Sequence, residues 1–441
     1  MSLRVAVVGC GTVGSQVVRL LTTQVDDLSA RVGRRLELVG VADRNLEAVV
    51  AQGVDPALVT DDSVGLVTRA DIVVELIGGT EPARGLMLAA MASGASVVTA
   101  NKALLAADGP TLYDAAAAAG VDLYYEAAVA GAIPVVRVLR EGMLGDQVRR
   151  VLGIVNGTTN YVLDTMTTDQ VGLDRAVKDA QRLGYAEADP TADVEGHDAA
   201  AKAALLASMA FHTRVSIDDV SCEGITALTD DDVAWAQRTG HVVKLLAVAE
   251  RLGGPDGSSG GGGISVRVHP ALVPQTHPLA GVRGAFNAVF IEAEAAGPIM
   301  LYGQGAGGVP TSSAVVSDVV AAARNRVTGG RGPLESAYAA LPVLPASAAV
   351  SRFQVRMDVA DRTGVLATVS AALADAGVSI ESVRQSPGGA VRQEAPVDVA
   401  HLVITTHAAT EAARVATIAA LDRLDVVYQV VSVIRVEGDV S

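Results

Sequence analysis

The sequence predicts an α/β protein made of a doubly wound parallel sheet, an α+β region and a C-terminal ferredoxin-like domain. Three observations carry this prediction. A glycine-rich loop directly follows the first apolar run, three further apolar runs alternate with helical stretches, and residues 350–441 follow the order β-α-β-β-α-β.

The first region contains four predicted strands, each a short apolar run rich in β-branched residues. They are "LRVAVVG" (3–9), "LELVGVAD" (36–43), "ADIVVELIG" (70–78) and "ASVVTAN" (95–101). Helical patterning from Thr12 to Leu21 follows the first run. Continuous apolar strands that are separated by helices indicate a parallel sheet covered on both faces. We expect this sheet to end near Pro134.

The segment "GCGTVG" lies between the first strand and the first helix. In this G-x-G-x-x-G context a helix N-terminus binds a pyrophosphate, which predicts a Rossmann-type dinucleotide site; a purely structural turn is the alternative. The expected cofactor contacts in this loop are Gly9, Gly11, Thr12, Val13 and Gly14.

An acidic residue at the end of the second strand commonly binds the ribose of the dinucleotide. Asp43 occupies this position, although the insert "RVGRR" makes its spacing from the glycine loop longer than usual. An Asp favours the ribose diol of NAD, whereas Arg44 could hold the 2′-phosphate of NADP. Both cofactors therefore stay open, and a turn residue at the strand end is the alternative role of Asp43.

The middle of the chain mixes helices and strands and predicts an α+β region. The expected helices are 174–183, 198–212 and 231–251, and the expected strands are 150–157, 264–273 and 285–295. The segment Gly253 to Gly263 is expected to be a flexible loop inside this region. Residues 329–349, rich in Gly, Pro and Ala, are predicted to be a linker to the C-terminal domain.

Composition excludes several functional classes. The chain has 441 residues and a net charge of −15, which disfavours nucleic acids and anionic membranes as partners because both need basic surface. Its two cysteines, Cys10 and Cys222, exclude a disulfide framework. The N-terminus does not resemble a secretory signal, and no apolar run is long enough to span a membrane. We expect a cytoplasmic location.

The stretch "GYAEADPTADVEGHDAAAK" (184–202) concentrates charge in an otherwise apolar chain. A solvated loop is one interpretation, and a polar active site at the start of a buried helix is the other. Lys202 follows Asp198 by four residues, so the two side chains share one face of a helix. Local sequence does not decide between these interpretations.

Six motifs together resemble those of one family. They are "GCGTVG", "TANKALL", "YYEAAVAGAIP", "GIVNGTTNYVL", "GYAEADPTADVEGHDAAAK" and "GQGAGGVPTSSAVVSD", in that order. The chain resembles a homoserine dehydrogenase of the long form, which carries a C-terminal ACT regulatory domain. The resemblance covers essentially the whole chain. It implies the NAD(P)-dependent interconversion of L-homoserine and L-aspartate 4-semialdehyde in threonine, methionine and isoleucine biosynthesis.

The resemblance also implies a domain division. Residues 1–135, completed by about 305–328, would bind the dinucleotide, and residues 136–304 would bind the substrate and carry out catalysis. Residues 329–349 would be the linker and 350–441 the ACT domain. Further cofactor contacts are implied at Asn101, Lys102, Gly305 and Gly307.

Oxidation of a primary alcohol needs a group that takes the hydroxyl proton, and the substrate's ammonium needs anionic partners. The resemblance and this chemistry both suggest Lys202 as the base, with Asp198 orienting it. Lys102 is implied at the reacting oxygen as well, and which lysine moves the proton stays open. The implied substrate-binding residues are Glu187, Asp193, Gly157, Thr158 and Thr159, the last three in "NGTTN", where Thr158 or Thr159 could instead cap a helix.

The resemblance implies two further ligands. A monovalent cation, Na⁺ or K⁺, would be bound by Glu126 and by backbone carbonyls of Val129, Gly131 and Ile133, because oxygen ligands suit a hard cation. The ACT domain, with Gly364 in "DRTGVLA", would bind an amino-acid effector, and threonine is the implied one. A domain used only for assembly is the alternative. A homodimer or homotetramer is expected.

Two other functions compete with this one. An aldehyde dehydrogenase acting on an acyl phosphate needs a thiol nucleophile, but Cys10 lies in the glycine loop, where it would face the pyrophosphate, and Cys222 has no His nearby in sequence. An amino-acid sensor with a vestigial nucleotide site would require degraded catalytic positions. Those positions are intact in this chain.

Overall fold

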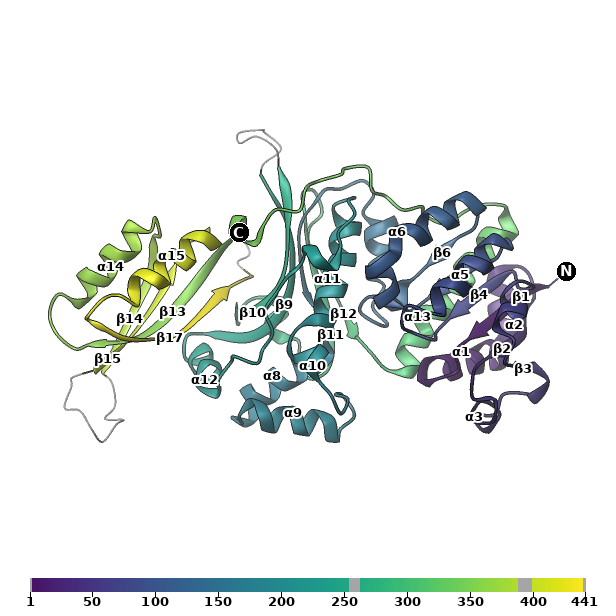
Figure 1. Cartoon of the computed structure of the whole chain (residues 1–441), viewed down its shortest axis with the longest axis horizontal. Helices are drawn as coiled ribbons and strands as arrows, with labels where there is room; N and C mark the ends of the chain where they lie inside the picture. Colours follow the sequence, from purple (N-terminus) through teal and green to yellow (C-terminus); the bar gives the residue numbers. More distant parts are fainter. Residues whose placement is uncertain (1, 254–261, 388–398, 439–441) are drawn as a thin grey trace.

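The computed structural model describes residues 2–253, 262–387 and 399–438. The chain forms an elongated molecule with three parts in a row (Figure 1). The N-terminal parallel sheet lies at one end, a mixed sheet with its helices lies in the middle, and the C-terminal domain lies at the other end. The predicted Gly253–Gly263 loop falls almost wholly outside the described residues.

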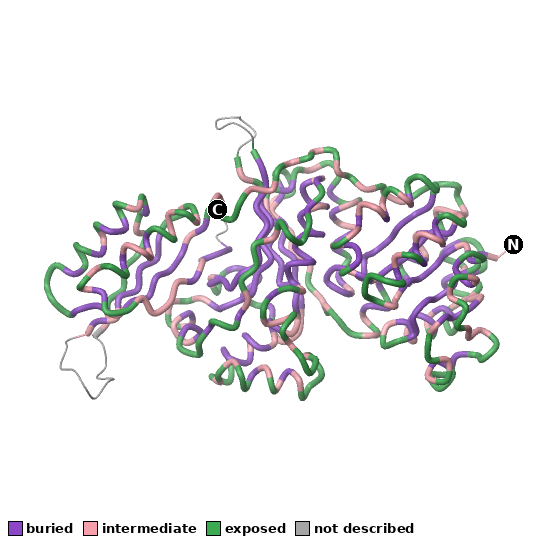
Figure 2. Tube along the Cα trace, in the orientation of Figure 1, coloured by how far each residue is buried: buried purple, intermediate pink, exposed green. Residues whose placement is uncertain are grey.

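The first sheet has six parallel strands in the order β3-β2-β1-β4-β5-β6. They are β1 (Leu3–Val8), β2 (Leu36–Ala42), β3 (Val59–Thr60), β4 (Ile72–Glu75), β5 (Ser96–Thr99) and β6 (Leu123–Tyr124). The continuous apolar runs are buried because helices cover both faces (Figure 2). The strand order reverses between β1 and β4, and α/β sheets bind ligands at such a switch point.

Two layers of helices cover this sheet. One face packs against α1 (Thr12–Thr23), α2 (Val25–Val32) and α13 (Gly308–Thr328), and the other against α4 (Ser63–Val67), α5 (Ala83–Ala92) and α6 (Lys102–Ala119). A short helix, α3 (Leu46–Ala51), follows β2. Because α13 comes from far along the sequence, the chain leaves this region after β6 and later returns to it.

The central region is built on five antiparallel strands in the order β12-β11-β7-β9-β10. They are β7 (Val148–Ile154), β9 (His241–Leu252), β10 (Gly263–Pro274), β11 (Phe286–Ala293) and β12 (Gly297–Gln304), with the short β8 (Ser221–Cys222) beside β10. The helices are α7 (Val135–Arg137), α8 (Gly157–Asp169), α9 (Leu173–Arg182), α10 (Thr191–Val194), α11 (His197–Ala210) and α12 (Asp230–Arg238). Helices α8 and α11 pack on one face of the sheet.

The prediction of one helix over 231–251 was wrong. Helix α12 ends at Arg238, Gly240 adopts a left-handed φ of 77°, and the remainder forms the buried strand β9. The run "HVVKLLAVAERL" is apolar on both faces, so its periodicity does not separate a strand from a helix. Strand β12 and helix α8 were also absent from the predicted elements.

The C-terminal domain confirms the β-α-β-β-α-β order. Its elements are β13 (Val350–Ala360), α14 (Val365–Asp375), β14 (Ile380–Pro387), β15 (Val399–Thr406), α15 (Glu411–Leu421) and β17 (Val427–Val436), with the short β16 (Ala409–Thr410) paired to β13. The strands are antiparallel in the order β17-β13-β15-β14. Both helices lie on one face of this sheet (Figure 1).

A feature without a sequence signal is the joint between the last two regions. The end of β17 pairs in parallel with β10, through Arg435 opposite Ala271, and joins the two sheets into one of eleven strands. Just beyond β17 the buried Glu437 forms ion pairs with Arg150 of β7 and Arg267 of β10, the latter at 3.3 Å. The joint is therefore both a strand pairing and a buried charge cluster.

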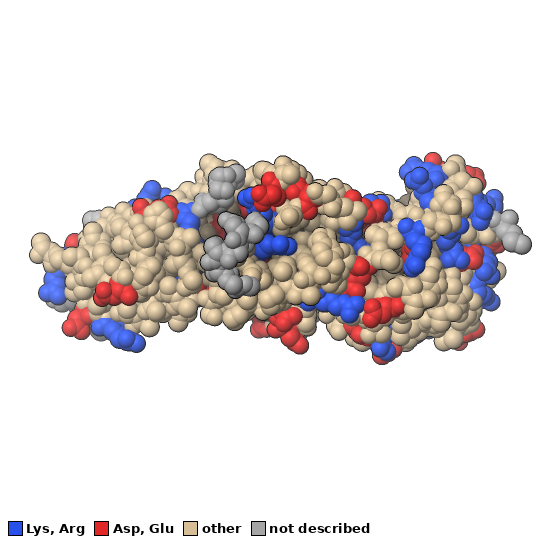
Figure 3. Space-filling view, turned by 90° about the horizontal axis from the view of Figure 1, so that it is seen from above, with Lys and Arg blue, Asp and Glu red and all other residues tan. Residues whose placement is uncertain are grey.

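Two further features concern the surface. Within the described ranges, no helix is long and apolar enough to cross a membrane. On the face seen in Figure 3, lysines and arginines are interspersed with acidic residues over a mostly uncharged surface.

Substituting Glu437→Gln should destabilise the protein by about 3 kcal/mol, because it leaves the two buried arginines Arg150 and Arg267 with Glu250 as their one remaining ion-pair partner among the described residues. Burial opposes ionisation of Glu437, but Arg150 and Arg267 hold the pKa of its carboxyl below the usual range. Urea unfolding followed by circular dichroism measures the effect. The control is Glu381→Gln, whose carboxylate pairs with Arg352 at the surface and should matter little. Equal effects of the two substitutions would contradict the role of Glu437.

Candidate active site

A cavity of about 840 Å³ lies between the first sheet and the central region. Its walls come from the start of α6, the start of α8, residues 183–193, the first half of α11 and residues 305–307. The charged stretch 184–202 therefore lines a cavity and continues into the buried helix α11. This placement favours the active-site interpretation of that stretch over a solvated loop.

The glycine loop has the geometry of a dinucleotide cradle. Gly9 has a left-handed φ of 93°, and a Cβ on Gly14 would stand 2.1 Å from the Gly9 carbonyl oxygen, so neither position tolerates a side chain. A Cβ on Gly11 would meet open space, at the position that precedes α1. Thr12 and Val13 form the first turn of α1. The loop thus leaves a helix N-terminus open to a phosphate group.

Asp43 is hydrogen-bonded to the backbone of the glycine loop. Its carboxylate accepts hydrogen bonds from the backbone N–H of Cys10 at 2.7 Å and of Asn45 at 3.0 Å. Burial opposes ionisation, but these N–H donors keep the pKa of Asp43 below its ordinary value. Arg44 beside it is exposed. The geometry leaves both the NAD and the NADP possibility open.

The two thiols lie outside the lining of the cavity, Cys10 buried and Cys222 exposed. The expectation that Cys10 faces the pyrophosphate position was wrong. Its side chain is buried in the core, and its Sγ contacts Gln52. Cys222 donates to the Glu195 carbonyl at 3.3 Å. Burial raises the pKa of both thiols, and neighbouring carboxylates add to the effect. This disfavours a thiol-dependent enzyme.

Asp198 binds two lysines, one from each side of the cavity. Lys202, one turn further along α11, donates to Asp198 Oδ2 at 2.8 Å and to the Val155 carbonyl at 2.7 Å. Lys102, at the start of α6, forms an ion pair with Oδ1 of the same carboxylate. Burial and the nearby Lys102 lower the pKa of Lys202, while Asp198 opposes that shift. A lowered pKa favours the neutral amine, the form of Lys202 that can accept a proton.

Asn156 begins the segment "NGTTN", which was expected to line the substrate pocket, but no role of its own was predicted for it. Its side-chain N–H₂ donates to Asp193 at 2.6 Å and to Asp198 at 2.9 Å, and its Oδ1 caps α8 through the N–H of Thr159. One amide thus fixes two carboxylates and the start of a helix. A strand followed by Asn and a helix was the available signal, since Asn is a preferred N-cap.

The other expected substrate contacts divide into two groups. Glu187, Asp193, Gly157 and Thr158 line the cavity, and Thr158 Oγ1 donates to the Tyr185 carbonyl at 2.6 Å. Thr159 does not fit its expected role, because it is only 1% exposed and its hydroxyl bonds back to Asn156. The expected cap at Thr158 or Thr159 is likewise corrected to Asn156.

Asn101 and the glycines near residue 305 lie on the cofactor side of the cavity. Asn101 caps α6 by accepting from the N–H of Leu104, and it donates to the Gly79 carbonyl at 2.7 Å. Gly305 and Gly307 line the cavity. These contacts bring segments from three parts of the chain to one edge of the first sheet.

The expected cation ligands lie on one buried turn. Glu126, Val129, Gly131 and Ile133 are all buried or nearly so, and Ala130 and Gly131 have left-handed φ values of 57° and 59°. The Glu126 carboxylate accepts from the N–H groups of Val136 and Arg137 at the start of α7. Burial raises the pKa of Glu126, although those N–H groups oppose the shift. In the described part of the chain, no cluster of three His, Cys, Asp or Glu side chains could hold a metal.

Comparison with known proteins agrees with this geometry. Residues 9–126 match the NAD-binding domain of homoserine dehydrogenases, residues 134–320 match the homoserine dehydrogenase family, and residues 353–426 match the ACT domain. The chain belongs to the homoserine dehydrogenase family. This confirms the resemblance predicted from the six motifs, and with it an oxidoreductase that has an NAD(P)-binding domain and an ACT domain.

Similar proteins cover nearly the whole chain. The chain is 52% identical over 439 residues to the homoserine dehydrogenase of Corynebacterium glutamicum, covering 99% of this chain and 96% of that protein. It is 55% identical over 436 residues to that of Mycobacterium tuberculosis, with 98% and 97% covered. A crystal structure of a homoserine dehydrogenase from Thiobacillus denitrificans superposes with a TM-score of 0.89 at 39% identity, covering 99% and 98%.

Substituting Cys222→Ser should leave the turnover number for homoserine within about twofold of wild type, because its thiol is a poor nucleophile outside the cavity. Steady-state assays of NAD(P)H formation measure this. Cys10→Ser is assayed in parallel. Because the Cys10 side chain is buried, the melting temperature of this variant also measures the effect of the thiol on core packing. Loss of most activity in Cys222→Ser with a normal melting temperature would restore the thiol mechanism.

Proposed function

We propose that this chain oxidises L-homoserine to L-aspartate 4-semialdehyde, and reduces it in reverse, in the biosynthesis of threonine, methionine and isoleucine. The observation that carries the proposal is the Asp198 carboxylate bound by Lys102 and Lys202 inside a cavity lined by Gly305 and Gly307, whose next residue, Gly308, abuts Thr12 of the glycine loop. The dinucleotide, NAD or NADP, accepts the hydride from the alcohol carbon when it is bound. The chain's own side chains must then bind the substrate and take the hydroxyl proton.

We assign the proton transfer to Lys202. Its lowered pKa favours the neutral amine that accepts the hydroxyl proton, and in the reverse direction its ammonium returns a proton to the carbonyl oxygen. Asp198 orients Lys202 through the 2.8 Å hydrogen bond. Lys102 lies on the cofactor side of Asp198 and stabilises negative charge that develops on the reacting oxygen.

Substrate binding is assigned to the acidic side chains that line the cavity. Glu187 and Asp193 would hold the substrate's ammonium, because both are carboxylates that line the cavity. Asp193 is fixed by its 2.6 Å hydrogen bond from Asn156, so it is oriented before substrate arrives. Gly157 and Thr158, at the start of α8, would contact the carboxylate end through backbone N–H groups.

We infer a division of labour along the chain. Residues 1–135 together with 305–328 would bind the dinucleotide through Gly9, Gly11, Thr12, Val13, Gly14, Asp43, Arg44, Asn101, Lys102, Gly305 and Gly307. The packing of α13 on α1 supports this grouping. Residues 136–304 would carry the substrate site, 329–349 the linker and 350–441 regulation.

A monovalent cation, Na⁺ or K⁺, is proposed at Glu126 with the carbonyls of Val129, Gly131 and Ile133. A buried carboxylate and backbone oxygens on one left-handed turn form an all-oxygen donor set, which suits a hard cation. Its role would be to hold this turn between the two regions rather than to take part in the reaction.

We propose that the C-terminal domain binds threonine as a feedback inhibitor. The ACT match and the joint at Glu437 support this role, since a domain tied to the catalytic sheet can transmit a change of state. We also propose that the protein forms a homodimer or homotetramer in the cytoplasm. The alternative function of the domain is assembly alone.

Substituting Lys202→Ala should lower kcat about 1,000-fold, because it removes the proton acceptor. The dissociation constant of the reduced dinucleotide, measured by its fluorescence, should change little. Lys178→Ala is the matched control, an exposed lysine of α9 that should keep wild-type kcat. Near-normal turnover of Lys202→Ala would move the proton transfer to Lys102.

Adding L-threonine should lower the rate of homoserine oxidation, measured at 340 nm with NAD and with NADP in parallel. D-threonine is the control compound, because it has the same charge and composition but the opposite handedness. Inhibition by L-threonine alone would support a stereospecific effector site. An unchanged rate with both compounds would contradict the feedback role and favour the assembly alternative. The rates with NAD and with NADP also show which cofactor the enzyme prefers.

A further inference from the structure

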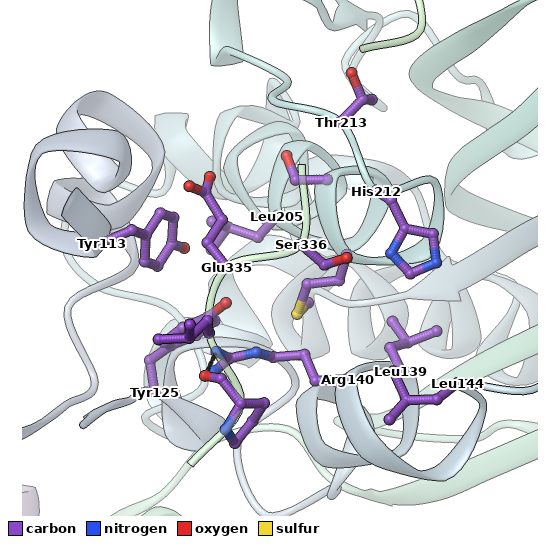
Figure 4. A pocket seen from close by; sticks show the side chains of 14 residues that line it. Tyr113, Tyr125, Leu139, Arg140, Leu144, Leu205, His212, Thr213, Glu335 and Ser336 are labelled. Carbon is purple, nitrogen blue, oxygen red and sulfur yellow. Dashed lines mark hydrogen bonds between the residues drawn. The ribbon is translucent and has the colours of Figure 1, made fainter. Parts of the chain in front are cut away.

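A second cavity, of about 320 Å³, lies between α6 and α11 and shares no lining residue with the active-site cavity (Figure 4). One face of α11 connects the two. Asp198, Ala201 and Lys202 line the active site, and Leu205, Ser208 and Met209 continue the same helical face into the second cavity. Met209 is seven residues beyond Lys202, about 10 Å along the helix axis.

Helix α6 is arranged in the same way. Lys102 and Ala106 line the active site, whereas Tyr113, further along the helix, lines the second cavity. Between them the helix is kinked at Asp108, whose φ of −145° is not helical, two residues before Pro110. The two helices that carry the catalytic lysines therefore also form two walls of the second cavity.

The linker to the C-terminal domain covers this cavity. Arg140 donates to the Pro333 carbonyl at 2.5 Å, and Arg214 donates to both carboxylate oxygens of Glu335, at 2.9 and 2.6 Å. The Tyr338 ring stacks on His212 with 4.9 Å between ring centroids. A ligand here would contact the linker as well as α6 and α11.

The chemistry of the walls is apolar with one polar end. Apolar contacts come from Leu139, Leu144, Leu205, Met209 and Leu334. The Arg140 guanidinium lies 4.9 Å from the centre of the Tyr125 ring and forms no ion pair with any carboxylate of the described residues. His212 has a left-handed φ of 52°, and its Nδ1 is buried without a hydrogen-bond partner in the described part of the chain.

We propose that this cavity binds a small monocarboxylate with a branched or aromatic apolar body, its carboxylate on Arg140 and its body against Leu205 and Met209. A guanidinium matches a carboxylate in geometry as well as charge. Glu335, the carboxylate that lines the cavity, is paired with Arg214 rather than with Arg140. The cavity volume lies at the small end of ligand sites, roughly 300–1,000 Å³, so the ligand has the size of an amino acid. The proposal is independent of the function assigned to the active site.

Methyl NMR on the full chain with dinucleotide bound tests the proposal. The methyl groups of methionine are labelled with ¹³C, and the Met209 signal is assigned from Met209→Leu. Titration with 4-methylpentanoate should shift the Met209 signal in a saturable way. The uncharged 4-methylpentanamide should bind at least about tenfold more weakly, because it lacks the charge that Arg140 recognises. L-leucine is titrated in parallel. Binding of both acids supports an amino acid as the ligand, whereas binding of 4-methylpentanoate alone supports a carboxylic acid without an ammonium group.

Two variants locate the site. Arg140→Met should weaken binding of 4-methylpentanoate about tenfold by removing the cation. Leu144→Asp should weaken it too, because Leu144 lies at the cavity rim with 68% exposure and tolerates a charge without loss of folding. Val64→Asp, on a comparably exposed position of α4, is the control and should bind like wild type.

Three results would overturn the proposal. The first is equal affinity for the acid and the amide, and the second is unchanged affinity in both Arg140→Met and Leu144→Asp. The third is a Met209 signal that neither acid shifts at about 20 mM, a concentration well above those at which a specific site of this size binds.

Discussion

The sharing of one carboxylate by two lysines is the interaction on which the rest of the site depends. Asp198 lies in the first turn of α11, yet its second lysine, Lys102, comes from α6 of the first sheet region. Burial alone would favour a neutral Asp198, but the two ammonium groups hold the pKa of its carboxyl well below the usual range. Because Lys102 belongs to the first sheet region and Lys202 to α11 itself, part of the electrostatic stabilisation of Asp198 comes from contact between the two regions.

The same physical rule governs the joint near the C-terminus. Arg150, Arg267 and Glu250 come from strands of the central sheet, and Glu437 completes their charge balance from beyond β17. Burial and the nearby arginine Arg435 lower the pKa of His269 to about 3, so this imidazole is neutral and adds no charge. Charges buried in this way are stable only as a complete set, which ties the position of the last strand to the central sheet.

Much of the fold could be predicted from the sequence, because its signals are local. Apolar runs gave the first sheet, and the strand and helix order gave the C-terminal domain. Strand β9 could not be recognised, since burial on both faces removes the alternation that marks a strand. In the site, the pairing of Lys202 with Asp198 was predictable from their four-residue spacing. Asn156, in contrast, is separated by 37 and 42 residues from Asp193 and Asp198, to which it donates. The hydroxyl of Thr159 bonds back to Asn156 instead of entering the cavity. The joint at Glu437 depends on contacts between residues 287 and 170 apart, which no local pattern encodes.

The return of α13 to the first sheet has a mechanical consequence. The polypeptide crosses between the first sheet region and the central region three times: after β6, before α13, and along residues 329–349, where Ala339 donates to the His212 carbonyl. Three covalent connections restrict the rotation of one region against the other more than a single connection would. Any change in the separation of Lys102 and Asp198 would therefore require all three connections to adjust together.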